Sequence, residues 1–222
     1  MGAKNIKKIG NLKFSQSYSD LKNELNLKIK KKLRKKKIIL AAVSTHKGEE
    51  LFCGKVHNNL KKKYKNIISI IIPRHIDRSH EIKEELISNK LNVHLHTSNK
   101  PIKSDTDIYL VDTFGETKSF LKLSKTTFMG KSIYSHGGQN PLEAARLGNR
   151  IIHGPNIENF IEVYDFLKKQ GISAKVNSLR DLEKLVIKFD RKINYSQQII
   201  KKLSYTGNQI LLNNEKEINK YC

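Results

Sequence analysis

Residues 134–148 read Tyr-Ser-His-Gly-Gly-Gln-Asn-Pro-Leu-Glu-Ala-Ala-Arg-Leu-Gly and form the most informative stretch of the chain. Gly137 and Gly138 allow a sharp turn and a close approach of a ligand to the backbone. Asn140 is a preferred N-cap residue and Pro141 suits a first helical turn, so the glycine turn is predicted to lead into a helix N-terminus. Such an end suits a phosphate, although the same residues would also cap a helix that binds nothing.

Around this stretch, short apolar runs alternate with helical patterns. The alternation predicts an α/β fold: a Rossmann-like parallel sheet with helices on both faces. The expected strands are 38–43, 67–72, 92–96, 107–111, 126–129, 150–153 and 173–176. The expected helices are 49–64, 79–88, 116–123, one that starts at Asn140, and 157–169.

The two ends of the chain differ from this middle part. We predict three parts: a basic, helical linker segment over 1–36, the Rossmann-like domain over 37–190, and C-terminal helices over 191–222. The first segment leads into the basic run Lys30–Lys37, which is either a solvated helix end or a contact for acidic lipid.

Composition narrows the classes of partner. Lys and Arg total 43 against 21 Asp and Glu, a net charge of +22, which favours anionic partners but also fits a general lysine bias. No interleaved aromatic-basic pattern supports nucleic-acid stacking, so we expect no nucleic-acid partner. Cys53 and Cys222 have no metal-ligand spacing, and no apolar run is long enough for a spanning helix. A cytoplasmic location is expected.

Chemically active residues follow five of the predicted strands. Because parallel strands end at one edge of a sheet, these loops are expected to form a ligand site there. They are Ser44-Thr-His-Lys-Gly-Glu-Glu50, Pro73-Arg-His75, Asp112-Thr-Phe-Gly-Glu116, Gly130-Lys-Ser132 and Gly154-Pro-Asn156. Each has a simpler interpretation as well: hydroxyls and carboxylates that cap helices, exposed loop histidines, and an Arg74–Asp77 ion pair.

Other common sites are disfavoured. The chain has neither a Walker loop nor a G-x-G-x-x-G motif, which disfavours ordinary ATP or NAD binding. Asp105-Thr-Asp107 has the form of a metal-binding motif, but it precedes a strand and so belongs to the opposite edge of the sheet. No metal site is predicted.

Six motifs together resemble the 3-deoxy-D-manno-octulosonic acid (Kdo) transferases of lipopolysaccharide synthesis, in that family's order and spacing. The resemblance covers about residues 8–190. The motifs are Gly10-Asn-Leu-Lys-Phe14, Ser44-Thr-His-x-Gly-Glu-Glu50, Pro73-Arg-His75, Asp112-Thr-x-Gly-Glu116, Gly137-Gly-x-Asn-Pro-Leu-Glu143 and Gly154-Pro-x-x-x-Asn-Phe160. The chain departs from the family at Gln139, where histidine is usual, and at Phe114, where another apolar residue such as methionine is usual.

The resemblance implies one half of a GT-B glycosyltransferase, the C-terminal half that binds the donor CMP-Kdo. The family transfers Kdo to the lipid A precursor with inversion, without a metal or other cofactor at the donor site. CMP contacts are then expected at Pro73, Arg74, Phe114, Gly115, Glu116, Asn140, Pro141, Leu142 and Glu143. Supporting donor-loop residues are expected at Ser44, Thr45, His46, Gly137 and Gly138.

No residue of this chain inherits the catalytic base, which in the family lies in an N-terminal acceptor domain. The implied partners are CMP-Kdo, the lipid A precursor through a separate N-terminal domain or chain, and an anionic membrane surface at the inner face of the cell inner membrane. The alternative is a CMP-binding remnant or interaction protein without catalysis.

Overall fold

The structure is a computed structural model that describes residues 11, 14, 25–191 and 197–220. Most of the motif Gly10–Phe14 and the terminal Cys222 lie outside the described residues. The chain divides into two units, one of which spans Leu21–Tyr195 and contains the sheet. Helix α8 (Gln197–Ile218) belongs to the other unit and presents exposed apolar side chains, among them Tyr205 and Leu212.

The sheet has seven strands, all parallel, in the order β3-β4-β2-β1-β5-β6-β7. Every strand expected from the sequence is present, with ends shifted by at most two residues. The strands are β1 (Lys37–Thr45), β2 (Ile67–Pro73), β3 (Val93–Leu95), β4 (Ile108–Leu110), β5 (Thr126–Met129), β6 (Arg150–His153) and β7 (Ser173–Lys175). The predicted fold class is therefore confirmed.

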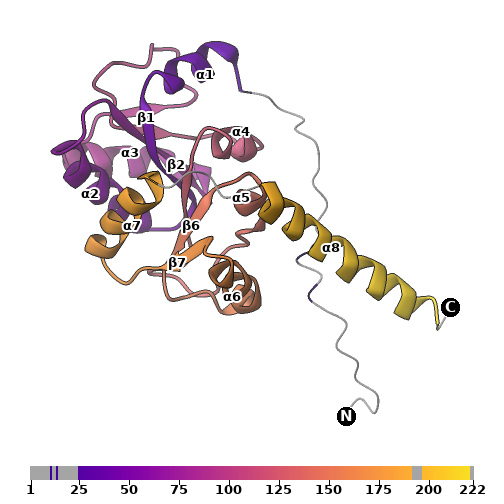
Figure 1. Cartoon of the computed structure of the whole chain (residues 1–222). Coiled ribbons are helices and arrows are strands. Elements are labelled where there is room, and N and C mark those ends of the chain that lie inside the picture. Colours follow the sequence, from indigo (N-terminus) through magenta and orange to yellow (C-terminus); the bar gives the residue numbers. More distant parts are fainter. Residues whose placement is uncertain (1–10, 12–13, 15–24, 192–196, 221–222) are drawn as a thin grey trace. The chain divides into compact units, whose positions relative to one another are not determined.

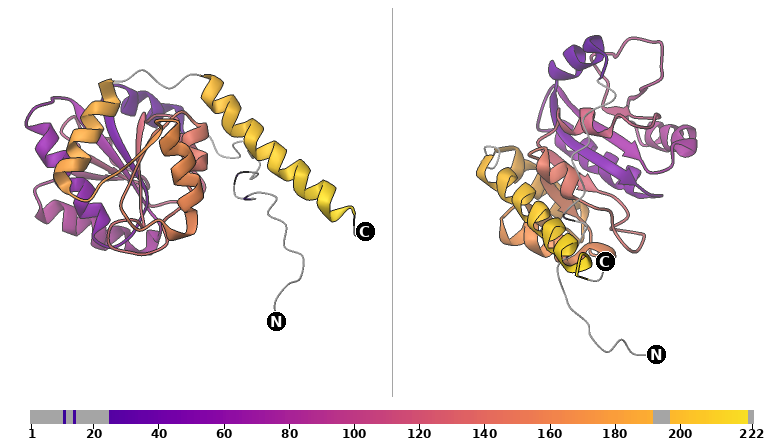
Figure 2. Two further views of the ribbon diagram at one scale, coloured as in Figure 1. Left: turned by 60° about the horizontal axis from the view of Figure 1, so that its bottom comes forward. Right: turned by 90° about the vertical axis from the view of Figure 1, so that its right-hand side faces the viewer.

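Helices cover both faces of the sheet, as Figures 1 and 2 show. One face carries α2 (Glu49–Lys61), α3 (Ser79–Ser88) and α7 (Leu179–Arg191), with α2 in contact with both of the others. The other face carries α4 (Thr117–Leu121), α5 (Leu142–Arg146) and α6 (Ile161–Lys169). Two short 3-10 helices, η2 (Ile76–Arg78) and η3 (Glu158–Phe160), precede α3 and α6.

The core explains why the apolar runs become strands. All seven residues of β2 are buried, as expected of a central parallel strand that is covered on both faces. From α2, Phe52, Cys53 and Leu60 pack onto the sheet beside Val186 of α7. Cys53 is fully buried, and burial raises the pKa of its thiol well above the ordinary value.

The basic run forms part of α1 (Leu27–Arg34), which lies within the same unit as the sheet. Leu33 is fully buried, and Lys32 Nζ donates to the carbonyl of Ile102 at 3.3 Å. The side chain of Asn66 donates to Lys35 O at 3.0 Å, which places α1 beside the lysine-rich segment 61–65. We call positions 28–37 and 61–65 together the basic face; it lies at the amino ends of the strands. The boundary expected at residue 36 stays a prediction.

A buried polar cluster underlies this amino edge. His57 Nδ1 and Ser69 Oγ are 2.9 Å apart, and His57 Nε2 lies 3.4 Å from Asp107 Oδ1. The other Asp107 oxygen accepts hydrogen bonds from Lys61 Nζ at 3.0 Å and from the backbone N–H of Asn92 at 2.9 Å. Burial by itself would raise the pKa of Asp107, but His57, Asn92 and Lys61 outweigh it and lower that pKa to about 2.

Asp107→Asn should therefore destabilise the fold in a pH-dependent way. The folded-state pKa lies below the ordinary value of 3.8, so the carboxylate stabilises the fold above about pH 4 and loses this effect as the pH falls through 2. We expect a loss of about 1–2 kcal/mol at pH 7, from urea unfolding, that shrinks between pH 4 and pH 2. Asp105→Asn, at an exposed neighbouring carboxylate, is the control; an equal effect of both variants would contradict the account.

Candidate functional site

The loops at the carboxyl edge of the sheet are joined through one buried side chain, Glu49. This carboxylate is fully buried and accepts four backbone hydrogen bonds. The donors are the N–H groups of His46 at 2.9 Å, Lys131 at 2.7 Å, Ser132 at 2.8 Å and Ile133 at 3.0 Å. Three successive N–H groups of the loop after β5 thus close on an anion supplied by the first turn of α2.

Glu49 lies at the position where open parallel sheets bind ligands. β1 has β2 on one side and β5 on the other, so the chain reverses its direction of progress across the sheet between β1 and β5. Ligands of such folds bind beyond the carboxyl ends of the strands at this switch point. The loops of β1 and β5 approach so closely there that a Cβ on Gly130 would lie 2.2 Å from Ser44 O. Ser44 itself has a positive φ of 53°.

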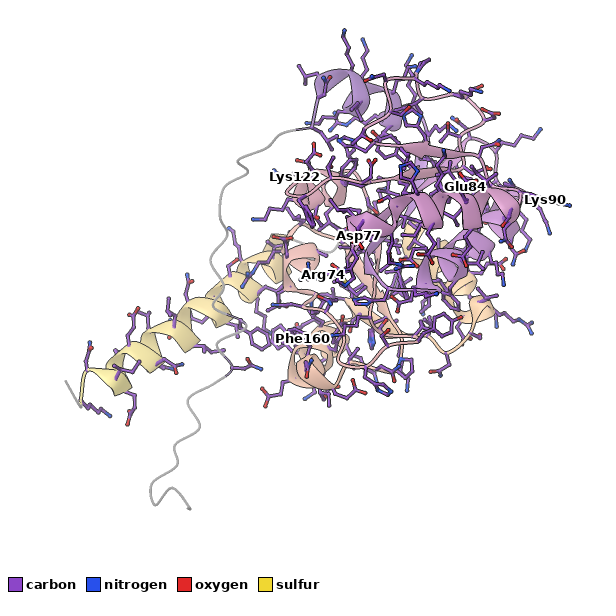
Figure 3. All side chains as sticks on the ribbon, turned by 180° about the vertical axis from the view of Figure 1, so that it is seen from behind. Arg74, Asp77, Glu84, Lys90, Lys122 and Phe160 are labelled. Atoms are coloured by element: carbon purple, nitrogen blue, oxygen red, sulfur yellow. The ribbon has the colours of Figure 1, made fainter. Side chains whose placement is uncertain are left out.

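The loop after β2 brings Arg74 to this edge. Its backbone N–H donates to Thr45 O at 3.0 Å, while its side chain is exposed (Figure 3). Among the described residues the guanidinium makes no ion pair, so the Arg74–Asp77 pair that the sequence allowed is not formed. The next residue, His75, packs its ring edge-on against His46, with centroids 5.5 Å apart.

The first loop and the first turn of α2 also hold buried polar atoms that make no hydrogen bond among the described residues. They are Thr45 Oγ1, His46 Nε2 and Glu50 Oε2. Burial lowers the pKa of His46, despite the opposing charge of Glu49, and burial raises the pKa of Glu50, although Arg78 lies 3.3 Å away. Of the predicted loop residues, Thr45 is thus interior, and Ser44 and His46 are partly buried.

The loop after β4 presents the side chain of Phe114, which is 69% exposed, followed by Gly115 at φ 89°. Glu116 is the N-cap residue of α4, yet its side chain makes no capping bond; it accepts from Thr113 Oγ1 at 2.6 Å and lies 2.9 Å from His96 Nε2. Asp112 does not cap this helix either, because it accepts from the N–H and hydroxyl of Thr97.

The glycine turn predicted from the sequence is present, with φ of 102° at Gly137 and 70° at Gly138. The space beside it is filled by protein: a Cβ on Gly137 would lie 2.7 Å from Asn159 Nδ2, and one on Gly138 3.0 Å from the Cα of Ile157. Glu158 accepts the N–H of Gly137 at 2.7 Å. Sequence reasoning did not single out Glu158 or the buried role of Glu49.

The helix expected from Asn140 begins at Leu142 and has only five residues. Asn140 Oδ1 accepts the N–H of Leu142 at 3.1 Å, and Pro141 and Leu142 are buried. Glu143 is exposed and lies 3.3 Å from Lys118 Nζ, which links α5 to α4. Because α5 is so short, its dipole contributes little, and most positive charge for a ligand must come from side chains.

Two surface cavities of about 620 and 540 Å³ lie away from these loops, beside β3 and next to the C-terminal end of α2, and neither is lined by a predicted donor-site residue. Asp105 borders both cavities and Asp107 borders the smaller one, at the amino edge, as their place before β4 predicted. Within the described part of the chain, no cluster of three or more His, Cys, Asp or Glu side chains is arranged to hold a metal, and no helix is long and apolar enough to cross a bilayer.

The structure thus defines a Rossmann-like domain whose loops at the carboxyl edge of the sheet present an exposed arginine, an exposed phenylalanine and the carboxylates of Glu116 and Glu143. In sequence the chain is similar to Kdo transferases. It is 32% identical over 183 residues to the 3-deoxy-D-manno-octulosonic acid transferase of Rickettsia bellii, covering 82% of this chain and 43% of that protein. The protein of the same name from Haemophilus influenzae is 32% identical over 178 residues, covering 79% of this chain and 40% of that protein.

A solved structure supports the fold assignment. The C-terminal CMP-Kdo binding domain of WaaA from Acinetobacter baumannii superposes with a TM-score of 0.67 at 22% identity, covering 83% of this chain and 94% of that one. No model of a known protein family matches the chain. The resemblance that the motifs indicated is confirmed, and the chain spans about two fifths of the length of the two relatives above. The individual donor contacts stay predictions.

Glu49→Gln should destabilise the domain strongly. The amide turns a donor toward an array of backbone N–H groups and leaves buried donors without an acceptor, so we expect a loss of about 2–4 kcal/mol in urea unfolding at pH 7. Glu50→Gln is the matched control at the next residue. Burial already disfavours its charged form, so we expect a loss below about 1 kcal/mol. Equal losses would show that Glu49 does not hold the two loops together.

Proposed function

We propose that this chain supplies the donor-binding half of a Kdo transferase and binds CMP-Kdo at the carboxyl edge of its sheet. One observation carries the proposal: Arg74, Phe114, Glu116 and Glu143 present side chains on this edge, in a chain similar over most of its length to Kdo transferases. In this arrangement Arg74 holds the phosphate through charge-assisted bonds, and Phe114 offers an apolar face to the base.

The remaining predicted donor residues contribute backbone groups to this surface or support its loops. The backbone N–H groups at Gly115 and near Asn140 complete the phosphate and ribose contacts, and Glu143 accepts from a ribose hydroxyl. Pro73, Pro141 and Leu142 are buried and hold the loops in place. No metal or other cofactor is assigned to the site, as the family resemblance implies.

In the transfer itself, an acceptor hydroxyl attacks the anomeric carbon of Kdo, the bond from that carbon to the phosphate oxygen breaks, and CMP leaves with the electron pair. A base takes the proton of the hydroxyl. We assign that base and the lipid A precursor to a separate N-terminal domain or chain, so the part of the reaction that falls to this chain is to bind CMP and to stabilise its departing charge.

Binding of CMP tests the proposal directly. Arg74→Ala removes a charge-assisted hydrogen bond to the phosphate and should weaken CMP roughly tenfold or more in calorimetry. Arg74→Lys should recover only part of this loss, because a single ammonium cannot bind the phosphate in two places. Lys90→Ala, on the far side of α3 from Arg74 (Figure 3), is the control and should bind CMP as the wild type does. A wild type that fails to bind CMP contradicts the proposal.

Transfer needs a second assay. CMP-Kdo and lipid A precursor are incubated with this chain, with and without a separately expressed N-terminal half of a related Kdo transferase. Turnover that requires both halves supports the proposal. CMP binding without transfer in any combination would instead support the alternative of a non-catalytic nucleotide-binding protein.

We further propose that the basic face contacts an anionic membrane, which would hold the protein at the inner face of the cell inner membrane. Positions 28–37 carry eight cations and no anion, and 61–65 carry four. Leu27, at the start of α1, is 77% exposed beside these charges. Lysines act as point charges that suit lipid headgroups, and exposed aromatic residues for stacking on nucleic acid are not a feature of this face.

The triple variant Lys28→Glu, Lys31→Glu, Lys35→Glu should lose binding to vesicles of phosphatidylglycerol at least tenfold, since each lysine contributes about 1 kcal/mol near such a surface. Vesicle sedimentation at low salt measures this. The control carries the same change of net charge away from this face, with Lys47, Lys168 and Lys169 changed to Glu. An equal loss in both triple variants would show that only net charge matters and would contradict a specific face.

A further inference from the structure

Three side chains, connected in a row by polar contacts, lie behind the loop after β4. Tyr109 in β4 is 1% exposed, and its hydroxyl lies 2.8 Å from His96 Nδ1. On the other side of the same ring, His96 Nε2 lies 2.9 Å from Glu116 Oε2. The side chains of His96 and Glu116 are only 11% and 18% exposed. The row therefore runs from the interior of the sheet to the edge where the donor is proposed to bind.

The direction of each hydrogen bond follows from the chemistry of the groups. A carboxylate only accepts, so the neutral imidazole of His96 carries its proton on Nε2, and its Nδ1 then accepts from the hydroxyl of Tyr109. Burial, together with the nearby carboxylates Glu116 and Asp112, raises the pKa of Tyr109, so the phenol keeps the proton that it donates. Tyr109 thereby selects the tautomer of His96 that binds Glu116.

The imidazole is also fixed by its surroundings. Its ring packs edge-on against Tyr109 and Phe120, with centroid distances of 5.7 and 5.4 Å. The backbone N–H of His96 donates to Leu110 O at 2.8 Å, which ties the residue to β4. A side chain held in this way presents Nε2 at one place.

The two oxygens of Glu116 are used unequally. Oε2 takes the bond from His96 and the bond from Thr113 Oγ1 at 2.6 Å. Oε1 has no partner among the described residues, and the carboxylate does not cap α4. The arrangement therefore anchors one oxygen and leaves the other, on a side chain that is 18% exposed, able to accept from a ligand.

We propose that His96, itself held by Tyr109, is a positioning residue of the donor site, which orients Glu116 so that one carboxylate oxygen accepts a hydrogen bond from the bound nucleotide. The inference rests on the proposed function. The ligand group is an N–H or O–H donor of the nucleoside, that is, the amino group of the base or a ribose hydroxyl. Sequence reasoning marked Glu116 but gave no role to His96.

Substitutions at His96 separate positioning from simple packing. His96→Gln keeps a nitrogen donor near the place of Nε2 and should stay within about threefold of wild-type CMP affinity. His96→Asn reaches toward Tyr109 but falls short of Glu116 and should lose roughly tenfold, as should Glu116→Gln, the loss of one charge-assisted hydrogen bond. The double variant His96→Asn, Glu116→Gln should lose no more than either single one, because both act through the same oxygen.

The control is His94→Asn. His94 stacks on Tyr109 with centroids 5.5 Å apart but is two residues from His96 and gives no contact to Glu116, so CMP affinity should stay unchanged. Thermal melts confirm that each variant is folded at the assay temperature. Titrations with UMP and with 2′-deoxy-CMP identify the ligand group: Glu116→Gln should matter least for the analogue that lacks the donor which Glu116 binds.

Three results would overturn the inference. If the wild type and Glu116→Gln bind CMP equally well, the carboxylate has no role in binding. Additive losses in the double variant, or a loss in His96→Gln as large as that in His96→Asn, would show that His96 acts only through packing. Failure of the wild type to bind CMP would instead overturn the proposed function, and this inference with it. Nitrogen NMR of the imidazole gives an independent readout. An imidazole that is protonated on Nδ1 and not on Nε2 would contradict the proposed hydrogen bonds of His96 to Tyr109 and Glu116.

Discussion

The carboxyl edge of this domain depends on the hydrogen bonds of Glu49. A glutamate in the first turn of α2 is buried completely and is compensated by four backbone N–H groups, three of them from a loop more than eighty residues later in the sequence. A buried charge is tolerated when its acceptors are filled in this way. The same bonds set the separation of the β1 and β5 loops, and with it the floor of the proposed donor site.

Further contacts extend this framework to the neighbouring loops. Arg74 N–H binds Thr45 O, Asp112 binds Thr97, and Glu158 binds Gly137, so adjacent loops are joined in pairs across most of the edge. Among the described residues, no hydrogen bond joins the loop of Arg74 to the loop of Phe114–Glu116, although their strands β2 and β4 are neighbours. This seam lies between two exposed candidate contacts, Arg74 and Phe114, so a ligand that enters there breaks no hydrogen bond between the two loops.

The sequence predicted the strands well because each is an apolar run bounded by turn residues, and parallel strands are buried on both faces. The gathering of the candidate loops at one edge followed from topology alone. The long-range pairings could not be predicted from the sequence. Nothing local indicates that Glu49 accepts from Lys131, or that β4 rather than β3 lies beside β2. The sequence placed the start of α5 too early. Asn140 accepts a hydrogen bond from the N–H of Leu142, two residues later, and a short capping pattern does not distinguish this bond from a helix N-cap.

The buried thiol of Cys53 makes the opening of this framework observable. It lies four residues after Glu49 on α2, between the helix and the sheet, and it is fully shielded from solvent. A thiol reagent reaches it only when α2 lifts from β1 and β2, because a protonated, enclosed sulfur does not react in place. In a variant without Cys222, the rate at which the Cys53 sulfur is labelled therefore measures how often α2, the helix that carries Glu49, leaves the sheet.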